Sequence, residues 1–400
     1  MALIEVNALT KVFGHDPKRA LGLLEQGWSK ERIAKETKLT VGVNRVSFAI
    51  EPGEIFVIMG LSGSGKSTLV RLLNRLIEPT AGQVLIKGKD IVKLRAEELR
   101  RVRRETISMV FQKFALFPHR SVLANVEYGL EVQGVPRAER REKAQRTLEL
   151  VGLGGVAGSR PDELSGGMQQ RVGLARGLAN DPDVLLMDEA FSALDPLIRK
   201  DMQDELLELQ ASMQKTIVFI THDLDEALRI GDRIALMKDG AVVQIGTPEE
   251  ILTNPANDYV ERFVEDVDLS KVLTASHVMV RAETVAMDRG PRVALQMMRE
   301  RGISNLYVVD KARQLLGVVT AEAAAEAASA GRSLADIVQR ELPTVAPDTL
   351  LAELFDLVGG AKVPPAVVDE RGRLLGIIIR GAVLGALSGQ TPPREAGDAG

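Results

Sequence analysis

Residues 60–68 read Gly-Leu-Ser-Gly-Ser-Gly-Lys-Ser-Thr, and this stretch decides the fold. The apolar run 55–59 before it predicts a buried strand, and leucines at helical spacing after it predict a helix. A glycine-rich turn at this point indicates a phosphate-binding loop, because its backbone N–H groups can point inward at phosphate oxygens. The start of the following helix adds about half a positive charge behind them. The alternative, a glycine turn without chemistry, leaves Lys-Ser-Thr in register without a role.

The loop therefore supplies candidates for binding a nucleoside triphosphate. We expect the Lys66 ammonium to reach the β- and γ-phosphates, the Ser67 hydroxyl to ligate Mg²⁺, and Thr68 to add a further phosphate contact. The other candidates in the loop line the phosphates with backbone or hydroxyl groups: Gly60, Ser62, Gly63, Ser64 and Gly65.

The composition limits the class of protein. A chain of 400 residues is long enough for two or three domains. A net charge of −4 gives no basic field for nucleic acid, and the absence of cysteine excludes disulfides and thiolate chemistry. Four scattered histidines argue against zinc. We see no secretory signal and no apolar run near the ~20 residues of a bilayer span, so any membrane role is expected to come through a partner.

Strand and helix patterns alternate from residue 55 to 245, which predicts an α/β fold with a mostly parallel sheet. Asp239-Gly240 predicts a hairpin between the apolar runs on either side of it. Nearer the N-terminus, residues 2–8 and 43–50 alternate as half-exposed strands do. We therefore expect an antiparallel part beside the parallel sheet.

An insertion at 14–40 separates these two N-terminal strands. Its pattern predicts one helix over about 17–26 and a second through about Thr37, capped by Ser29. Trp28, the only tryptophan, lies at the joint and is expected to pack against the helices. The alternative is a platform on which a ligand stacks.

The C-terminal part holds a weak internal repeat. Val308-Val-Asp recurs as Val367-Val-Asp, and Leu315-Leu-Gly recurs as Leu374-Leu-Gly, both at an offset of 59 residues. Each half is predicted to form a helix, a strand that ends in Asp, a turn, a second strand and a closing helix. The sequence thus predicts two similar α+β modules in tandem.

Two further segments follow the phosphate loop in a fixed order. Residues 164–170 read Leu-Ser-Gly-Gly-Met-Gln-Gln, and residues 184–189 read Val-Leu-Leu-Met-Asp-Glu. The ordered set resembles the ATP-binding-cassette (ABC) ATPases. The resemblance implies that Asp188 holds Mg²⁺, through water, and that Glu189 polarises the attacking water. The alternative is a pair of solvated charges at a strand end.

The same resemblance assigns roles to isolated residues. Gln112 matches the Q-loop, which senses the γ-phosphate and the metal, so the candidate metal ligands are Ser67, Gln112 and Asp188. His222, in Thr-His-Asp, matches the switch histidine that contacts the γ-phosphate and steadies the water. Phe13 stands where the family places the aromatic ring that stacks on adenine, and the alternative is a core phenylalanine.

Other matches point to a second subunit and a membrane partner. The apolar residues 114–119 either belong to a core or line the groove that grips a permease's coupling helix. A further set is implied to act across a dimer interface, where it completes the ATP site of a second copy or of a similar subunit: Ser165, Gly166, Gly167 and Asp195.

Distinctive stretches narrow the resemblance. Residues 190–199, Ala-Phe-Ser-Ala-Leu-Asp-Pro-Leu-Ile-Arg, and 254–259, Asn-Pro-Ala-Asn-Asp-Tyr, are two of them. With the insertion and the tandem repeat, the chain resembles the ATP-binding subunit of glycine betaine/proline betaine importers. The resemblance implies an ABC ATPase domain over 1–268, with a mostly parallel sheet, an antiparallel subdomain and a helical signature subdomain. A tandem CBS-domain pair is expected to follow.

We place the two CBS domains at 270–330 and 331–388, and expect a disordered tail at 389–400, which is rich in Pro, Gly and charge. In relatives such a pair tunes transport by ionic strength or by an adenine nucleotide, and Thr320 but not Ile379 offers a hydroxyl where such halves meet a ribose. Sensing and a purely architectural clamp between subunits both remain open.

The resemblance also implies the partners and the place of work. These are an inner-membrane permease, a second ATP-binding subunit and, indirectly, an extracytoplasmic substrate-binding protein. The chain would then be peripheral on the cytoplasmic face of the inner membrane, using ATP and Mg²⁺ to energise osmoprotectant uptake. One alternative is an importer for choline, carnitine or an amino acid. A more distant alternative is a soluble ABC ATPase with no role in transport.

Overall fold

A computed structural model describes residues 2–112, 115–265 and 267–387. The chain forms two compact units, Met1–Asp266 and Val267–Gly400. Phe114 and the tail that we predict to be disordered lie outside the described residues. Within the described part of the chain, every helix is too short or too polar to cross a membrane.

Unit 1 is built on a six-stranded sheet in the order β10-β9-β3-β8-β7-β6. All neighbours are parallel except β10 and β9, which form the hairpin predicted around Asp239-Gly240. Strands β3, β7 and β8 are wholly buried, as apolar and β-branched runs predict for a parallel sheet covered on both faces. The strands are β3 (Ile55–Met59), β6 (Ile107–Phe111), β7 (Val184–Asp188), β8 (Thr216–Thr221), β9 (Arg233–Lys238) and β10 (Ala241–Gly246).

A second, four-stranded sheet in unit 1 has the order β2-β1-β4-β5. Its strands are β1 (Ile4–Phe13), β2 (Thr40–Ile50), β4 (Ala81–Ile86) and β5 (Lys89–Asp90), all paired antiparallel. Strands β1 and β2 run further than the predicted 2–8 and 43–50. The register shifts after Val6, and Ala8 has φ 46°, so a bulge breaks the alternation of buried side chains although the pairing continues.

Both predicted helices of the insertion are present, as α1 (Pro17–Glu25) and α2 (Lys30–Thr37), and Ser29 caps α2 by accepting from the Arg32 N–H. Trp28 packs against a small apolar cluster that the insertion shares with β1 and β2, and its ring faces the Arg32 guanidinium at 3.7 Å. Lys30 Nζ lies 2.6 Å from Asp239 Oδ1, so an ion pair ties the insertion to the β9–β10 turn.

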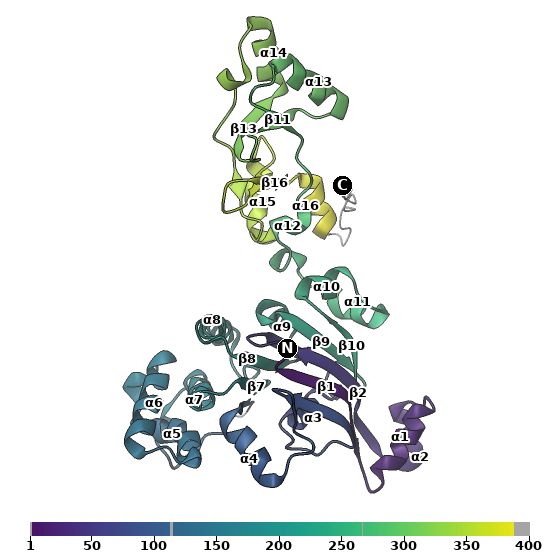
Figure 1. The fold of residues 1–400 in the computed structure, drawn as a ribbon, viewed down its shortest axis with the longest axis vertical. Coiled ribbons are helices and arrows are strands. Elements are labelled where there is room, and N and C mark those ends of the chain that lie inside the picture. The colour runs from purple at the N-terminus through teal and green to yellow at the C-terminus, as the bar shows by residue number, and fades with distance from the viewer. Residues whose placement is uncertain (1, 113–114, 266, 388–400) are drawn as a thin grey trace. The chain divides into compact units, whose positions relative to one another are not determined.

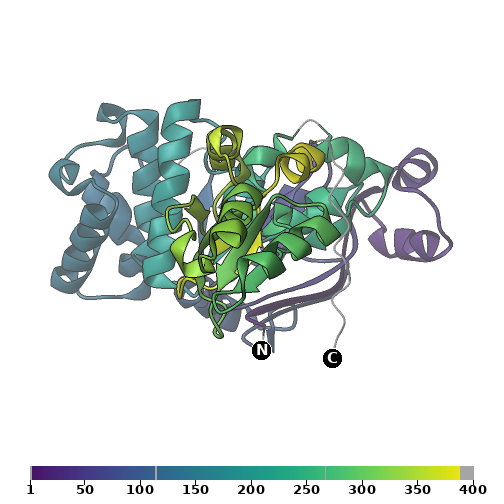
Figure 2. The same ribbon diagram turned by 90° about the horizontal axis from the view of Figure 1, so that it is seen from above.

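Helices α5, α6 and α7 pack together as a helical subdomain at one margin of unit 1, whereas α1 and α2 lie at the opposite margin (Figure 1 and Figure 2). The remaining helices surround the sheets. The α-helices are α3 (Lys66–Leu73), α4 (Ala96–Glu105), α5 (Val122–Gln133), α6 (Arg137–Leu150), α7 (Gly166–Leu178), α8 (Pro196–Met213), α9 (Leu224–Ile230), α10 (Pro248–Thr253) and α11 (Asp258–Val264), with 3-10 turns at Gly154–Val156 and Pro161–Glu163.

Unit 2 has the predicted repeat, with sheets β11-β12-β13 and β14-β15-β16. Strands β11 (Thr284–Ala286) and β14 (Thr344–Val345) were not predicted, because strands of three and two residues are too short to show a period. The other elements are α12 (Ala275–Val278), α13 (Pro291–Arg301), β12 (Asn305–Val309), β13 (Leu315–Thr320), α14 (Ala321–Ala330), α15 (Leu351–Gly360), β15 (Ala366–Val368), β16 (Leu374–Ile377) and α16 (Arg380–Leu387), with 3-10 turns at Leu269–Lys271 and Leu334–Asp336.

The two halves of unit 2 are joined by hydrogen bonds at equivalent positions. The Leu315 N–H donates to the Gly372 carbonyl and the Leu374 N–H donates to the Arg313 carbonyl, each at 3.0 Å. Because these residues correspond across the repeat, the halves meet with approximate two-fold symmetry. Tyr307, buried in the apolar cluster between the halves, donates from its hydroxyl to the Pro364 carbonyl at 2.5 Å.

Candidate nucleotide-binding site

The phosphate loop joins β3 to α3, and two of its glycines are required by their surroundings. A Cβ atom at Gly60 would lie 2.2 Å from the Met237 carbonyl oxygen, and one at Gly65 would lie 2.3 Å from the Gly42 carbonyl oxygen. Both glycines also have positive φ, 149° and 103°. The Gly240 N–H donates to the Ser64 carbonyl at 2.9 Å, so the β9–β10 turn supports the loop from behind.

Lys66 folds back over its own loop. Its Nζ donates to the carbonyls of Gly60 at 2.7 Å and Leu61 at 3.2 Å. Burial lowers the pKa of the Lys66 ammonium, and the nearby carboxylates of Glu189 and Asp188 oppose that shift. A buried cation held by carbonyls at a helix start suits the binding of phosphate oxygens.

Asp188, at the end of β7, faces the start of α3. The Ser67 Oγ donates to Asp188 Oδ1 at 3.3 Å, and Arg71 Nη2 lies 3.9 Å from Oδ2. Burial raises the pKa of the Asp188 carboxyl, whereas Arg71 and the Ser67 hydroxyl act against this. A hydroxyl and a carboxylate oxygen are hard ligands of the kind that Mg²⁺ prefers, so the pair fits the predicted metal site.

Gln112 and His222, predicted from separate parts of the chain, both contact Glu189. Gln112 Nε2 donates to Glu189 Oε2 at 3.2 Å, and His222 Nδ1 lies 3.5 Å from the same oxygen. Gln112 follows β6, Glu189 follows β7 and His222 follows β8, which are neighbouring parallel strands. The carboxyl ends of parallel strands share one edge of a sheet, which is where ligands bind in α/β folds.

Glu189 is held in an unusual backbone conformation. Its φ of 47° lies in the left-handed region, which costs free energy for a residue other than glycine. The Ser192 Oγ donates to the Glu189 carbonyl at 2.9 Å and accepts from Gln112 Nε2 at 3.2 Å. The side chains around Glu189 therefore stabilise a backbone turn that directs its carboxylate to the edge of the sheet.

Phe13 lies beside the phosphate loop in spite of the insertion. A Cβ atom at Gly42 would lie 2.8 Å from the Phe13 ring and 3.4 Å from the Thr68 methyl group. The Phe13 and Thr68 side chains therefore both lie next to Gly42. The Phe13 side chain is 39% exposed, and Lys11 Nζ lies 5.0 Å from its ring centroid. The ring is partly open to solvent, as a surface for stacking requires, and the structure does not bury it in a core.

The residues predicted to act across a dimer sit at helix starts. Ser165 caps α7 by accepting from the Met168 N–H at 3.4 Å, and Asp195 caps α8 by accepting from the Ile198 N–H at 3.1 Å. Within the described residues, neither side chain hydrogen-bonds to the phosphate loop of its own chain. A methyl group at Gly167 would lie 2.8 Å from the Ile198 side chain, so the two helix starts pack closely.

Two residues of this site, Gly42 and Arg71, were not predicted from the sequence, and Ser192 was expected only as part of the segment 192–195 that acts across the dimer. Arg71 follows Ser67 by four positions, so helical spacing could have placed it on the same face. Gly42 and Ser192 carry no local signal, because their roles depend on Phe13, Thr68 and Gln112 from other elements.

An apolar groove separates the central sheet from the helical subdomain. Phe117 is partly buried there against Tyr128, with ring centroids 4.7 Å apart, whereas Ala115 is exposed. Several large apolar side chains of the groove are unusually exposed, and they include Leu76, Phe111, Tyr128 and Val132. The described part of 114–119 thus contributes to a groove and not to a closed core.

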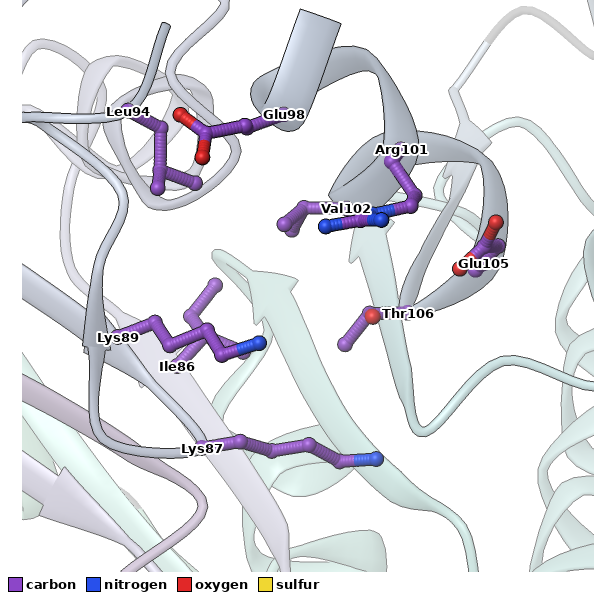
Figure 3. A pocket seen from close by; sticks show the side chains of 9 residues that line it. All are labelled: Ile86, Lys87, Lys89, Leu94, Glu98, Arg101, Val102, Glu105 and Thr106. Atoms are coloured by element: carbon purple, nitrogen blue, oxygen red, sulfur yellow. The ribbon is translucent and has the colours of Figure 1, made fainter.

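A second hollow, between β4–β5 and α4, holds none of the predicted site residues (Figure 3). Its charged lining side chains are Lys87, Lys89, Arg101, Glu98 and Glu105. Lys87 also pairs with Asp183 at 2.5 Å. With Asp183 counted, three cations stand against three carboxylates, so the hollow offers no excess positive charge to a phosphate group.

In unit 2, Thr320 caps α14 by accepting from the Ala323 N–H at 3.3 Å, whereas Ile379, its counterpart in the second half, is 39% exposed. The hydroxyl that we considered for a ribose therefore serves the helix start.

Comparisons with known proteins agree with this geometry. The family description "ABC transporter" matches residues 43–192, and "CBS domain" matches 275–330 and 334–389. The chain is 64% identical over 386 residues to the glycine betaine transport ATP-binding protein OpuAA of Bacillus subtilis, covering 96% of this chain and 92% of that protein. It is 53% identical over 401 residues to the glycine betaine/proline betaine transport system ATP-binding protein ProV of Salmonella typhimurium, covering 99% of each.

Among solved structures, unit 1 is similar to the dimeric, post-hydrolysis state of the ATP-binding cassette MJ0796 bound to ADP and Pi. The TM-score is 0.52 and the identity 33%, over 61% of this chain and 98% of that chain. The predicted ABC ATPase fold with a tandem CBS pair is thereby confirmed. The chain belongs to the ATP-binding subunits of ABC transporters of the glycine betaine/proline betaine type.

Proposed function

We propose that this ABC ATPase works as one of two paired subunits, and that hydrolysis drives uptake of glycine betaine, proline betaine or a related quaternary amine through a membrane permease. The observation that carries the proposal is the convergence of Gln112, Glu189 and His222 beside Lys66 and Asp188. Residues 1–268 would form the ATPase, and 270–330 and 331–388 the two CBS domains.

The phosphate loop binds and orients ATP. Phosphate oxygens would replace the carbonyls of Gly60 and Leu61 as partners of Lys66, because two opposite charges attract more strongly than a charge and a dipole. Ser67 and Asp188, with the amide oxygen of Gln112, would hold Mg²⁺, which when bound neutralises charge on the phosphates. Backbone N–H groups of 60–65 and the hydroxyls of Ser62, Ser64 and Thr68 would line the phosphates.

Glu189 orients the attacking water and receives its proton. Gln112 and His222 both contact Oε2 of the Glu189 carboxylate, which restrains its orientation and leaves Oε1 for the water. His222 would also contact the γ-phosphate. Phe13 would stack on the adenine, since its partly exposed ring borders the same point as Thr68.

A second subunit completes the site. Helix α7 opens at Ser165, Gly166 and Gly167, and its N-terminus favours an anion. Within the part of the chain that the structure describes, the Ser165 side chain makes no hydrogen bond to the phosphate loop of the same chain. The dimeric state of the similar cassette MJ0796 supports the same arrangement here. We expect a homodimer in which Asp195 also faces the partner.

The apolar groove would bind a permease helix at the cytoplasmic face of the inner membrane. Exposed apolar side chains rimmed by arginines are typical of a protein interface. Val132→Glu would place a charge in the groove, and we expect it to reduce uptake while basal ATP turnover is kept. Leu150→Glu is the matched control, because Leu150 is exposed to a similar degree (47% against 41% for Val132) but lies outside the groove. Equal uptake in the two variants would argue against this docking surface.

Unit 2 would regulate uptake in response to osmotic conditions, and the extracytoplasmic substrate-binding protein would deliver the solute on the far side of the membrane. Deleting residues 270–400 tests the regulatory role. A lost or shifted osmotic threshold would support sensing, whereas uptake with an unchanged threshold would leave only an architectural clamp.

The central experiment measures uptake of labelled glycine betaine in cells across a step in external osmolarity. The intact chain is compared with Glu189→Gln and with Glu353→Gln, an exposed glutamate of α15 that serves as control. We expect uptake to rise with osmolarity in the intact chain and the control, and to vanish in Glu189→Gln. Uptake that persists in Glu189→Gln would contradict the proposal for this solute.

A further inference from the structure

Helices α8 and α9 are joined by three polar side-chain pairs in a row. Arg199 Nη1 donates to Asp223 Oδ2 at 3.2 Å, and Gln203 Nε2 donates to Glu226 Oε1 at 3.2 Å. The third pair joins Arg229 Nη2 to Asp204 Oδ1 at 2.6 Å. All three pairs hold the two helices together, but only the first lies at the catalytic edge of the sheet.

Arg199 reaches a second element with the other arm of its guanidinium. Its Nη2 donates to the Leu194 carbonyl at 3.0 Å, within the segment 192–195 that begins with Ser192 beside Glu189. The planar guanidinium thus bridges two acceptors in fixed directions, which the single ammonium of a lysine does not do. The Arg199 side chain is 26% exposed, so its charge is partly screened from water.

Asp223 follows His222 directly and fixes the chain at that point. Its backbone N–H donates to the Thr221 Oγ1 at 2.9 Å, and its Oδ1 accepts from the Glu226 N–H at 3.2 Å, which caps α9. Its other oxygen, Oδ2, pairs with Arg199. The two flanking side chains therefore restrain the backbone that carries His222.

We infer that Arg199 and Asp223 are positioning residues that tie the segment 192–195 to His222, so that hydrolysis responds to the partner subunit. The inference rests on the proposed function, in which Asp195 faces a second copy. A displacement of the Leu194 carbonyl would move Arg199, and through Asp223 it would move the backbone at His222. Docking of the partner subunit would in this way change the position of His222, which holds the attacking water.

The test compares three variants of the full chain by ATP hydrolysis in the presence of Mg²⁺. Arg199→Met keeps the aliphatic stem and removes both hydrogen bonds, and Asp223→Asn keeps a helix-capping side chain but removes the charge. Asp204→Asn is the matched control, because it removes the same charge from a polar pair that joins the same two helices away from the site. The readouts are kcat, KM, the Hill coefficient for ATP and the midpoint of thermal unfolding.

We expect Arg199→Met and Asp223→Asn to lower kcat about tenfold and to bring the Hill coefficient toward one, with KM changed less than about twofold, as for a contact that acts in the transition state. Asp204→Asn should leave kcat, KM and the Hill coefficient unchanged. A normal kcat and Hill coefficient in Arg199→Met would overturn the inference. An equal loss of kcat and cooperativity in Asp204→Asn would also overturn it, because it would show a general effect of helix packing. A wild-type chain without cooperativity would instead contradict the paired-subunit function itself.

Discussion

Unit 1 and unit 2 both have aspartates at the ends of buried strands, but the carboxylates of the two units have different roles. In unit 2, Asp310 Oδ1 accepts from the N–H groups of Ala312 and Gln314, both at 2.8 Å. Asp369, its counterpart, accepts from Arg371 and Arg373 at 3.0 and 2.8 Å. These carboxylates close tight turns between two strands of the same module. In unit 1, Asp188 faces the Ser67 hydroxyl and Arg71 across the sheet edge.

The pKa shifts of Asp369 and Asp188 follow from these surroundings. The Arg373 backbone N–H lowers the pKa of Asp369, because it stabilises the charged form. Burial raises the pKa of Asp188, because the charged form loses water. A strand that ends in Asp therefore leads into a tight turn or contributes to a binding site, according to which groups contact the carboxylate. A carboxylate satisfied by its own turn contributes to the fold, and one left to distant side chains is free for a ligand.

The largest expected effect sharpens this contrast. Asp188→Asn should lower ATP turnover by about 100-fold or more, since a charged ligand of the metal is lost. The free energy of unfolding should not fall, because the substitution removes a buried charge. Phosphate release and thermal denaturation measure the two quantities. Asp310→Asn is the comparison from unit 2, and a similar loss of turnover there would contradict the distinction.

Glycines give the second comparison. Gly65→Ala should weaken ATP binding more than tenfold, because the new Cβ would lie 2.3 Å from the Gly42 carbonyl at a φ of 103°. Gly372→Ala has a φ of 73° but open space around the new Cβ, so it should cost only about 1–2 kcal/mol of backbone strain. Equilibrium binding of a fluorescent ATP analogue and thermal unfolding distinguish the cases. Normal nucleotide affinity in Gly65→Ala would show that the loop can rearrange.

A smaller effect is expected from Asp369→Ala, which opens the turn between β15 and β16. The unfolding midpoint should fall by a few degrees and ATP turnover should not change. The pKa of Asp369 is lowered in the folded state, so its stabilising contribution is present above the unfolded pKa and is lost as pH falls through the folded pKa. Asp356→Ala, an exposed change on α15, is the control. A difference from wild type that grows toward acid would have the wrong sign.

The smallest effect concerns Glu226, a buried carboxyl of α9. Burial raises its pKa, whereas hydrogen bonds from Thr221 and Gln203 oppose the shift. Because the folded pKa exceeds the unfolded one, its contribution to stability is present below the unfolded pKa and is lost as pH rises through the folded pKa. Glu226→Gln should therefore raise the unfolding midpoint slightly near neutral pH and least under acidic conditions. A variant less stable than wild type at pH 7 would show that the charged form is needed.

The sequence by itself determined the elements that carry a clear local pattern, and their order along the chain. Runs such as 55–59 and 216–220 are apolar enough to predict buried strands, Ser29 and Asp239-Gly240 predict a cap and a hairpin that the structure contains, and the repeat of 59 residues predicts both halves of unit 2. These signals are local, because they depend on spacing along the chain and on backbone preferences of single residues. The resemblance to ABC ATPases then identified the candidate residues of the site before any contact was known.

Only the tertiary structure decided which of those residues meet. Different elements meet where one Glu189 oxygen contacts both Gln112 and His222, where the Gly42 carbonyl closely approaches Gly65, and where Arg199 bridges Leu194 and Asp223. The bulge at Ala8 and the short strand β14 also escaped the sequence pattern, because a partner strand fixes each of them. Contacts between distant segments leave no period in the chain. They follow from the parallel sheet, which brings the ends of β6, β7 and β8 to one edge.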